Sequence, residues 1–272
     1  MHKFISFNRQ ILPAEQDLIS PISSAALYGK GIFTTLAIYN AKPFLWEKHW
    51  RRLLAHSAKL NIDLTNFDEE SVKSALSQII LQNRIETGRA RVTFFDESSS
   101  AIWNFETKNK TTLLITTADW RETESEARLT VSPFPVNSKS PLANIKSCNY
   151  LENLLVYEEA KKRGFDEALR LNEKCEIVSG SMANIFWVKN EHVFTPSLET
   201  GCLAGTTREF LTENFTIQEV KAELKQIIEA DEIFLTSAGI GLKSVSKIDE
   251  KSFDNEMTAK LQRFFTEETG SF

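Results

Sequence analysis

Hydrophobic and polar residues along the first 120 positions follow periods that predict strands, then helices, then strands again. Apolar residues on both sides of an Asn-Ala-Lys turn are typical of a hairpin, and apolar residues at helical spacing follow. The pattern predicts strands over residues 37–39 and 43–46 around a turn at 40–42, helices over 47–60 and from an Asp68 cap, and strands over 89–95 and 111–117.

A run of eight mostly charged and polar residues, DWRETESE at 119–126, interrupts this pattern and predicts a domain boundary. We therefore expect an N-terminal domain over residues 1–122 and a larger C-terminal domain over 123–272. In the second domain the pattern predicts strands over 128–134, 167–171, 183–188, 217–220, 232–236 and 243–248, and helices over 149–163, closed by Gly164, and near 206–214, 221–229 and 252–265. The predicted fold class is mixed α/β (α+β) with two domains.

Composition and charge exclude several classes of protein. The chain has 272 residues, 42% of them apolar and 25% charged, with a net charge of −5. The charges are spread along the sequence, so we expect no nucleic-acid partner. No uncharged apolar run approaches the ~20 residues of a membrane span, and we expect a soluble, cytoplasmic protein with no membrane partner. The spacing of three cysteines and four histidines predicts neither a disulfide framework nor a metal site.

Several common catalytic motifs are absent from the sequence. It contains no phosphate-binding loop of the GxxxxGK[ST] type, no complete GxGxxG, no GxSxG and no HExxH. The glycine pairs at residues 29–31 and 239–241 lack the third glycine of a dinucleotide fingerprint and are typical of turns. The segment GCLAGTTR at 201–208, in contrast, is a flexible loop that opens into an amphipathic helix, where unpaired N–H groups and the hydroxyls of Thr206 and Thr207 could bind a phosphate. Plain capping of the helix by threonine is the alternative.

Lys146 stands just ahead of a predicted helix whose buried face carries leucines. A lysine held against apolar surroundings favours its neutral amine, which can form a Schiff base with an aldehyde. A solvated surface lysine is the ordinary alternative.

Four blocks of the sequence, taken in order, resemble the class IV aminotransferase family. They are YGKGIFTTLAIYNAKPFLWEKHWRRLLAHSAKLNI, IKSCNYLENLLVYEEAKKRGFDEALRLNE, SGSMANIFWVKNEHVFTP and LAGTTREFL, and they span residues 28–211. The family consists of pyridoxal 5′-phosphate (PLP) enzymes of fold type IV and includes branched-chain and D-amino-acid aminotransferases and 4-amino-4-deoxychorismate lyase. The resemblance implies two domains with PLP between them.

The resemblance also implies roles for individual residues. Lys146 matches the lysine that binds PLP covalently and acts as the catalytic base, and Tyr150 matches a tyrosine near the phenolic oxygen of the cofactor. Residues matching the phosphate site are Arg52, Thr206, Thr207 and, in a later turn, Ser237, where Ala238 stands at a position that is threonine in some members.

Ser179 departs from the family pattern, which has a glutamate there that keeps the ring nitrogen of PLP protonated. A serine hydroxyl can donate a hydrogen bond to this nitrogen but cannot balance a positive charge, so the ring should be a weaker electron sink. Glu176 is expected to point to the opposite face of a strand and to be a poor substitute. A weaker sink favours elimination over transamination, because deoxychorismate cleavage also forms an aromatic ring.

Two residues are candidates for substrate contact. Thr34 lies in GIFTT, which resembles the lyase version of a segment in which many aminotransferases carry a glutamate. Arg91 aligns with a family arginine near a substrate carboxylate, although a solvated or structural arginine is an equal alternative. We therefore expect a homodimeric PLP-dependent lyase that converts a small amino substrate, 4-amino-4-deoxychorismate, to 4-aminobenzoate and pyruvate. The alternatives are a branched-chain or D-amino-acid aminotransferase and a non-catalytic PLP-fold binding protein.

Overall fold

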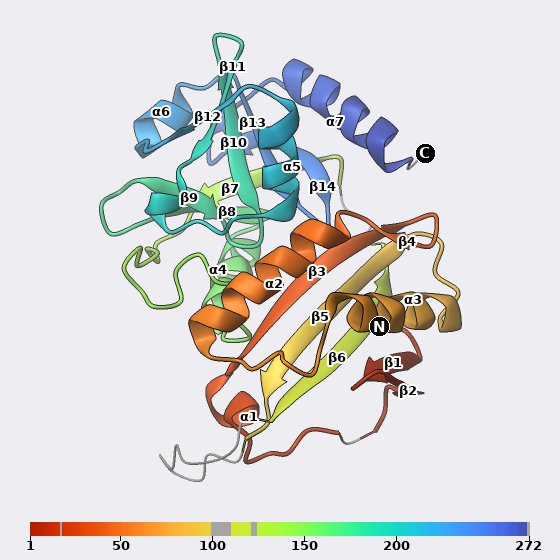
Figure 1. Cartoon of the computed structure of the whole chain (residues 1–272). Helices are drawn as coiled ribbons and strands as arrows, with labels where there is room; N and C mark the ends of the chain where they lie inside the picture. The colour runs from red at the N-terminus through yellow and green to blue at the C-terminus, as the bar shows by residue number, and fades with distance from the viewer. Residues whose placement is uncertain (17, 99–109, 121–123, 271–272) are drawn as a thin grey trace. The chain divides into compact units, whose positions relative to one another are not determined.

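The computed structural model describes residues 1–16, 18–98, 110–120 and 124–270, and these form two compact units (Figure 1). Unit 1 contains the described residues up to 120 together with Ile145–Tyr150. Unit 2 contains residues 124–144 and Leu151–Gly270. The predicted boundary at 122/123 falls on residues 121–123, outside the described residues, and stays a prediction.

Unit 1 is built on one antiparallel sheet with the strand order β2-β1-β6-β5-β3-β4. Helix α2 packs on β3, and α3 packs on β1 and β6. Both helices lie on the same side of the sheet in Figure 1. The elements of unit 1 are β1 (Phe4–Phe7), β2 (Gln10–Pro13), α1 (Ser24–Tyr28), β3 (Gly31–Tyr39), β4 (Lys42–Pro43), α2 (Trp46–Leu60), α3 (Glu69–Gln82), β5 (Gly88–Asp96) and β6 (Thr111–Asp119).

The beginning of α3 shows how the sequence pattern sets a helix in place. The Asp68 carboxylate accepts a hydrogen bond from the Ser71 N–H at 2.8 Å, so the predicted cap is confirmed. Val72, Leu76 and Ile79 then point into the core between helix and sheet. Burial of these side chains contributes about 1.5–3 kcal/mol each to folding.

The predicted strand over 43–46 is wrong after its first residue. Strand β4 ends at Pro43, and Leu45 adopts a left-handed backbone with φ of 54°. Helix α2 then begins at Trp46, whose ring stacks on Trp50 one turn later at 6.0 Å between centroids. Both indoles belong to the core, and this packing outweighs the local strand pattern.

Unit 2 is built on a mixed nine-stranded sheet with the order β12-β11-β10-β13-β14-β7-β8-β9, in which β15 pairs with β14. Helix α4 packs on β8, and α5 and α7 pack on β13. Its elements are β7 (Glu126–Val131), α4 (Leu151–Lys162), β8 (Glu167–Leu171), β9 (Ile177–Gly180), β10 (Asn184–Lys189), β11 (His192–Pro196), a 3-10 turn (Leu198–Thr200), α5 (Thr206–Asn214), β12 (Ile217–Val220), α6 (Leu224–Ile228), β13 (Glu232–Ser237), β14 (Gly241–Ile248), β15 (Lys251–Ser252) and α7 (Glu256–Thr269).

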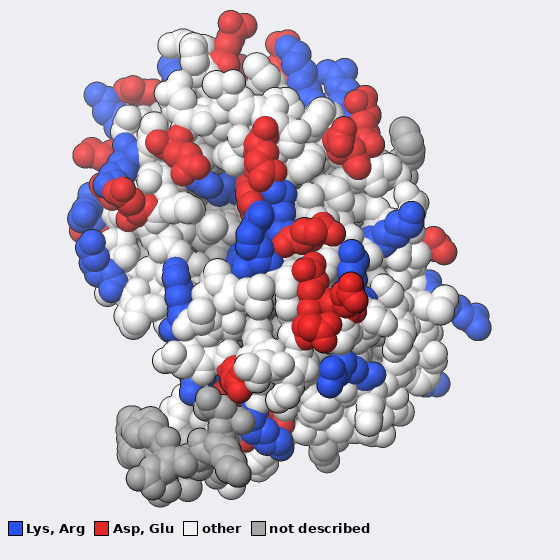
Figure 2. Space-filling view, viewed as in Figure 1, with Lys and Arg blue, Asp and Glu red and all other residues white. Residues whose placement is uncertain are grey.

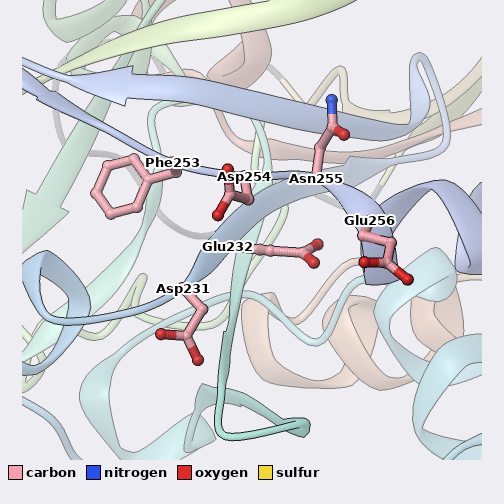
Figure 3. A pocket seen from close by; sticks show the side chains of 6 residues that line it. All are labelled: Asp231, Glu232, Phe253, Asp254, Asn255 and Glu256. Atoms are coloured by element: carbon pink, nitrogen blue, oxygen red, sulfur yellow. The ribbon is translucent and has the colours of Figure 1, made fainter.

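Helix α7 begins four residues later than predicted because its start is held by a distant carboxylate. Glu232 of β13 accepts hydrogen bonds from the Met257 and Thr258 N–H groups at 2.7 and 2.8 Å. Figure 3 shows this side chain running toward the start of the helix, beside a hollow of about 410 Å³. A carboxylate at this end complements the positive end of the helix dipole, and Gly270 ends the helix with φ of 59°.

The charged surface carries both signs. On the face shown in Figure 2, Lys and Arg side chains are interspersed with Asp and Glu side chains. In the part of the chain that the structure describes, no helix is both long enough and apolar enough to cross a membrane.

Candidate active site

Unit 1 gathers a cluster of cations around two aromatic rings. The Lys146 Nζ lies 4.6 Å from the centroid of the Phe33 ring and 5.0 Å from that of Tyr150. The guanidinium carbon of Arg91 lies 3.6 Å from the Phe33 centroid, and the two rings meet edge to face at 5.2 Å. Cations are attracted to the faces of aromatic rings, so Phe33 and Tyr150 hold the amine in place.

The backbone of Lys146 is fixed as firmly as its side chain. Its carbonyl accepts from the Phe33 N–H at 2.9 Å, and Cys148 N–H donates to the Gly31 carbonyl at 2.8 Å, so this segment runs as an extra strand beside β3. Gly31 allows the close approach, because a Cβ there would lie 2.9 Å from both the Cys148 Sγ and a backbone oxygen. The Lys146 N–H itself donates to the Nδ1 of buried His56 at 3.1 Å.

The surroundings of Lys146 favour its neutral form. Burial lowers its pKa from 10.5 to about 7, and the positive charges of Arg52 and Arg91 contribute further. A substantial fraction of the amine is therefore unprotonated at neutral pH, which is the form that attacks an aldehyde.

Arg52 is oriented by a buried hydroxyl and a histidine. Its Nη2 donates to the Thr34 Oγ1 at 2.7 Å, and the same oxygen lies 2.6 Å from the Nδ1 of His49. The pKa of His49 lies well below its usual range because of burial and the charges of Arg52 and Lys146, so the ring is neutral. The Thr34 hydroxyl therefore connects the guanidinium of Arg52 to the imidazole of His49. Thr34, a candidate for substrate contact, is fully buried and acts here as a link.

Arg91, the second candidate for substrate contact, is an exposed residue of β5. Its Nε donates to Thr93 Oγ1 at 3.2 Å, and its guanidinium lies on the Phe33 ring. This arrangement holds the group beside Lys146 with donors remaining for an anion.

Unit 2 places the predicted phosphate residues at the start of α5 and the end of β13. Thr206 and Thr207 are buried in the first turn of α5, whose cap, Gly205, has no side chain to occupy the N–H groups. Asn184 of β10 pairs with Thr236 of β13 across the sheet and donates to the carbonyl of residue 203 at 2.8 Å, so it ties the two regions together.

Two further observations mark this part of unit 2 as suited to an anion. A Cβ on Gly205 would lie 2.0 Å from the Asn184 Oδ1, so the loop carries glycine where it passes this side chain. The Thr236 hydroxyl is buried and makes no hydrogen bond within the described residues. Ser237, the next residue, accepts from the Gly239 N–H at 3.3 Å. Buried donors without a partner and helix N–H groups together fit a phosphate.

Ser179 lies in β9, and its hydroxyl donates to the Gly180 carbonyl at 2.7 Å. The turn after it is held by Glu167, whose buried carboxylate accepts from the Ser181 and Met182 N–H groups at 2.9 and 3.2 Å. Glu176 accepts from Asn172 at 2.8 Å, so its carboxylate is engaged just before β9.

Several residues of these two regions were not singled out from the sequence. His49, His56, Phe33 and Asn184 are among them. His49, Arg52 and His56 recur at helical spacing, i, i+3 and i+7, and this spacing is the signal that would have placed both histidines on the face of α2 that carries Arg52.

Comparison with known proteins supplies the deciding observation: the model of the family "amino-transferase class IV" matches residues 31–248. The chain belongs to the class IV aminotransferases. PLP is the cofactor of this family. Within unit 1, the Lys146 cluster has the chemistry to bind an aldehyde, and within unit 2, the start of α5 has the chemistry to bind a phosphate.

Relatives of this class IV aminotransferase include enzymes of both reaction types. Aminodeoxychorismate lyase of Bacillus subtilis is 27% identical over 97% of this chain and 94% of its own length. Among solved structures, branched-chain aminotransferase from Thermoproteus uzoniensis with norvaline matches with a TM-score of 0.93 at 21% identity, over 99% of this chain and 95% of that one. The structure of 4-amino-4-deoxychorismate lyase from Pseudomonas aeruginosa matches with a TM-score of 0.85 at 22% identity, over 97% of this chain and 98% of that one. These structures share the fold of this chain.

Proposed function

We propose that this member of the class IV aminotransferase family is a PLP-dependent lyase that converts 4-amino-4-deoxychorismate to 4-aminobenzoate and pyruvate. The observation that carries the proposal is Ser179, which stands at the position of the family's glutamate and whose hydroxyl donates to the Gly180 carbonyl. Without a carboxylate to balance a protonated ring, a reaction with a low demand on the electron sink is favoured. The lyase of B. subtilis among the relatives supports the same choice.

The residues of unit 1 would bind the cofactor and move the proton. Lys146 would hold PLP in the resting protein, and PLP, once joined instead to the substrate amine, would supply an electron sink for the amine-bearing carbon. Lys146, released from this attachment and with a pKa of about 7, then removes the proton from that carbon. The electron pair would form the new ring double bond as the carbon–oxygen bond to the enolpyruvyl group breaks. The group would leave as an enolate, and Lys146 would return the proton to its methylene carbon to give pyruvate. Arg91 would hold a carboxylate of the substrate beside the amine.

The remaining candidates would hold the cofactor. Arg52, kept in orientation by Thr34 and His49, would bind the phosphate from unit 1. Thr206, Thr207 and Ser237 are the residues of unit 2 that would bind it. Tyr150 would lie near the phenolic oxygen. We also infer a homodimer, as the family resemblance implies.

The test compares two reactions of the purified, PLP-loaded protein. Pyruvate release from aminodeoxychorismate should be much faster than amino transfer to 2-oxoglutarate from leucine or D-alanine. Amino transfer without pyruvate release would instead support the alternative function of an aminotransferase. The fold similarity to the T. uzoniensis branched-chain aminotransferase is the reason for testing it. Neither reaction, with PLP bound, would support a binding protein.

A further inference from the structure

The side chain across the sheet from Ser179 is an arginine. In the antiparallel ladder of β8 and β9, Arg170 pairs directly with Ser179. Directly opposed residues of an antiparallel pair point to the same face, with Cβ atoms about 5 Å apart. The position where the family carries a carboxylate therefore has a guanidinium as its neighbour.

The guanidinium of Arg170 is buried and only partly used. The side chain is 4% exposed and forms an ion pair through Nη2 with Glu152 in the first turn of α4. Its Nε is buried and makes no hydrogen bond within the described residues. A buried donor without an acceptor is costly, so this group is suited to a ligand atom that accepts a hydrogen bond.

Two of the three carboxylates near this pair are engaged elsewhere, and the third, Glu152, pairs with Arg170 itself. Glu152 is 65% exposed and contacts Arg170 from α4. Glu167, on the same strand as Arg170, binds the N–H groups of the turn after β9, and burial raises its pKa. Glu176 is bound by Asn172. The charged side chain directly opposite Ser179 is therefore Arg170, and the carboxylate that pairs with it is largely exposed to solvent, which weakens its compensation of the arginine charge.

We infer that Arg170, together with Ser179, keeps the ring nitrogen of bound PLP unprotonated. The inference rests on the proposed function, which places Ser179 at that nitrogen. A neighbouring positive charge disfavours a second one. The Nε–H of Arg170 can donate a hydrogen bond to a neutral pyridine nitrogen, and the Ser179 hydroxyl can do so after turning away from the Gly180 carbonyl. Arg170 is thus a positioning residue that sets the strength of the electron sink and selects elimination over transamination.

The test measures the protonation state of the PLP ring nitrogen directly by NMR, independently of catalysis. Protein is loaded with PLP labelled with ¹⁵N in the ring, and the ¹⁵N resonance is followed from pH 5 to 9. The wild-type resonance should remain that of a neutral pyridine throughout. In Arg170→Gln, which keeps a hydrogen-bond donor but removes the charge, the apparent pKa of the nitrogen should rise by about one unit or more, a tenfold change in its protonation equilibrium. Ser179→Glu should give the resonance of a protonated ring at neutral pH.

Two control variants separate charge from structure. Arg170→Lys restores the charge and should restore the wild-type resonance. Arg128→Leu removes another arginine of the same sheet, one that pairs with Asp166 at 3.1 Å, and should leave the resonance unchanged. A resonance that Arg170→Gln does not move would overturn the inference and leave the proposed function standing. A protonated ring in the wild type would overturn the inference and also remove the weak electron sink on which the proposed function rests. Failure of the protein to bind labelled PLP would overturn both.

Discussion

Lys146 shows how far a single residue can be understood from its neighbours. The sequence predicted a lysine beside the buried leucine face of the next helix, and that prediction is wrong because these leucines are exposed. The amine is instead packed against the rings of Phe33 and Tyr150, and its pKa is about 7. Part of that shift comes from Arg52 and Arg91, which lie far from the lysine in sequence. No local pattern could have shown that these three cations meet, because strand pairing and helix packing bring them together.

The pH dependence of Lys146 reactivity follows from this pKa. The folded protein disfavours the charged amine, so reactivity should be low at pH 5–6, rise through about pH 7 and level off above pH 8, rather than rise near 10.5. Brief acetylation of the apoprotein at a series of pH values, with mass spectrometry of the Lys146 peptide, measures this profile.

Removal of the Arg91 charge should shift the pH profile of Lys146 acetylation. Arg91→Met deletes a like charge, so the midpoint should shift to higher pH, whereas Arg89→Met, two residues earlier on the same strand, should leave it in place. A wild-type midpoint near 10.5 would contradict the electrostatic description of the site.

The affinity for PLP should fall when Arg52 is removed and also when the Thr34 hydroxyl that orients it is removed. Arg52→Ala should weaken PLP binding to the apoprotein by about 2 kcal/mol or more, because a charge-assisted contact to phosphate is lost. Thr34→Val keeps the shape but removes the bond that orients the guanidinium and should cost about 1 kcal/mol, while Thr34→Ser should bind PLP as the wild type does. Fluorescence titration with PLP gives these affinities, and an unchanged affinity in Arg52→Ala would remove Arg52 from the site.

At the scale of elements, the long periodic segments were predicted well and the segments held by distant contacts were not. Helix α3 begins at the cap that the sequence indicated. Helix α7 begins four residues late, because its start depends on Glu232 of another strand. The short strands β1 and β2 were missed. They form a local hairpin of four residues each, and only β1 joins the sheet, through β6 about a hundred residues later.

The start of α5 should tolerate no side chain at Gly205. In Gly205→Ala the new methyl would lie 2.0 Å from the Asn184 Oδ1, so the loop or the asparagine must move, and the affinity for PLP should fall by about tenfold or more. Gly164→Ala is the matched control. It has a φ of 84° and nothing within 4 Å of the added Cβ, so it should lose about 1 kcal/mol of stability through backbone strain and keep its PLP affinity. Equal loss of PLP affinity in both variants would separate the α5 start from the cofactor.

For the whole molecule, the expected homodimer has a candidate surface on α4. Leu151, Leu154 and Leu155 lie on one face of that helix and are 62%, 44% and 51% exposed. Such an exposed apolar stripe is typical of a protein interface. Leu154→Lys should shift the mass in sedimentation equilibrium from dimer toward monomer, whereas Leu81→Lys, at an isolated leucine that is 79% exposed, should not. A wild-type monomer would rule out this assembly.

The strand-like pairing of Lys146 with β3 also bears on how the protein folds. Its contact with Phe33 closes a loop of roughly 110 residues. Closing so long a loop costs chain entropy, and this cost slows the formation of the contact during folding. The nascent chain therefore carries an ordinary, protonated lysine, and the reactive amine arises only with the long-range pairing. We expect capture of the aldehyde to coincide with the slowest refolding phase, so that incompletely folded molecules do not consume cofactor.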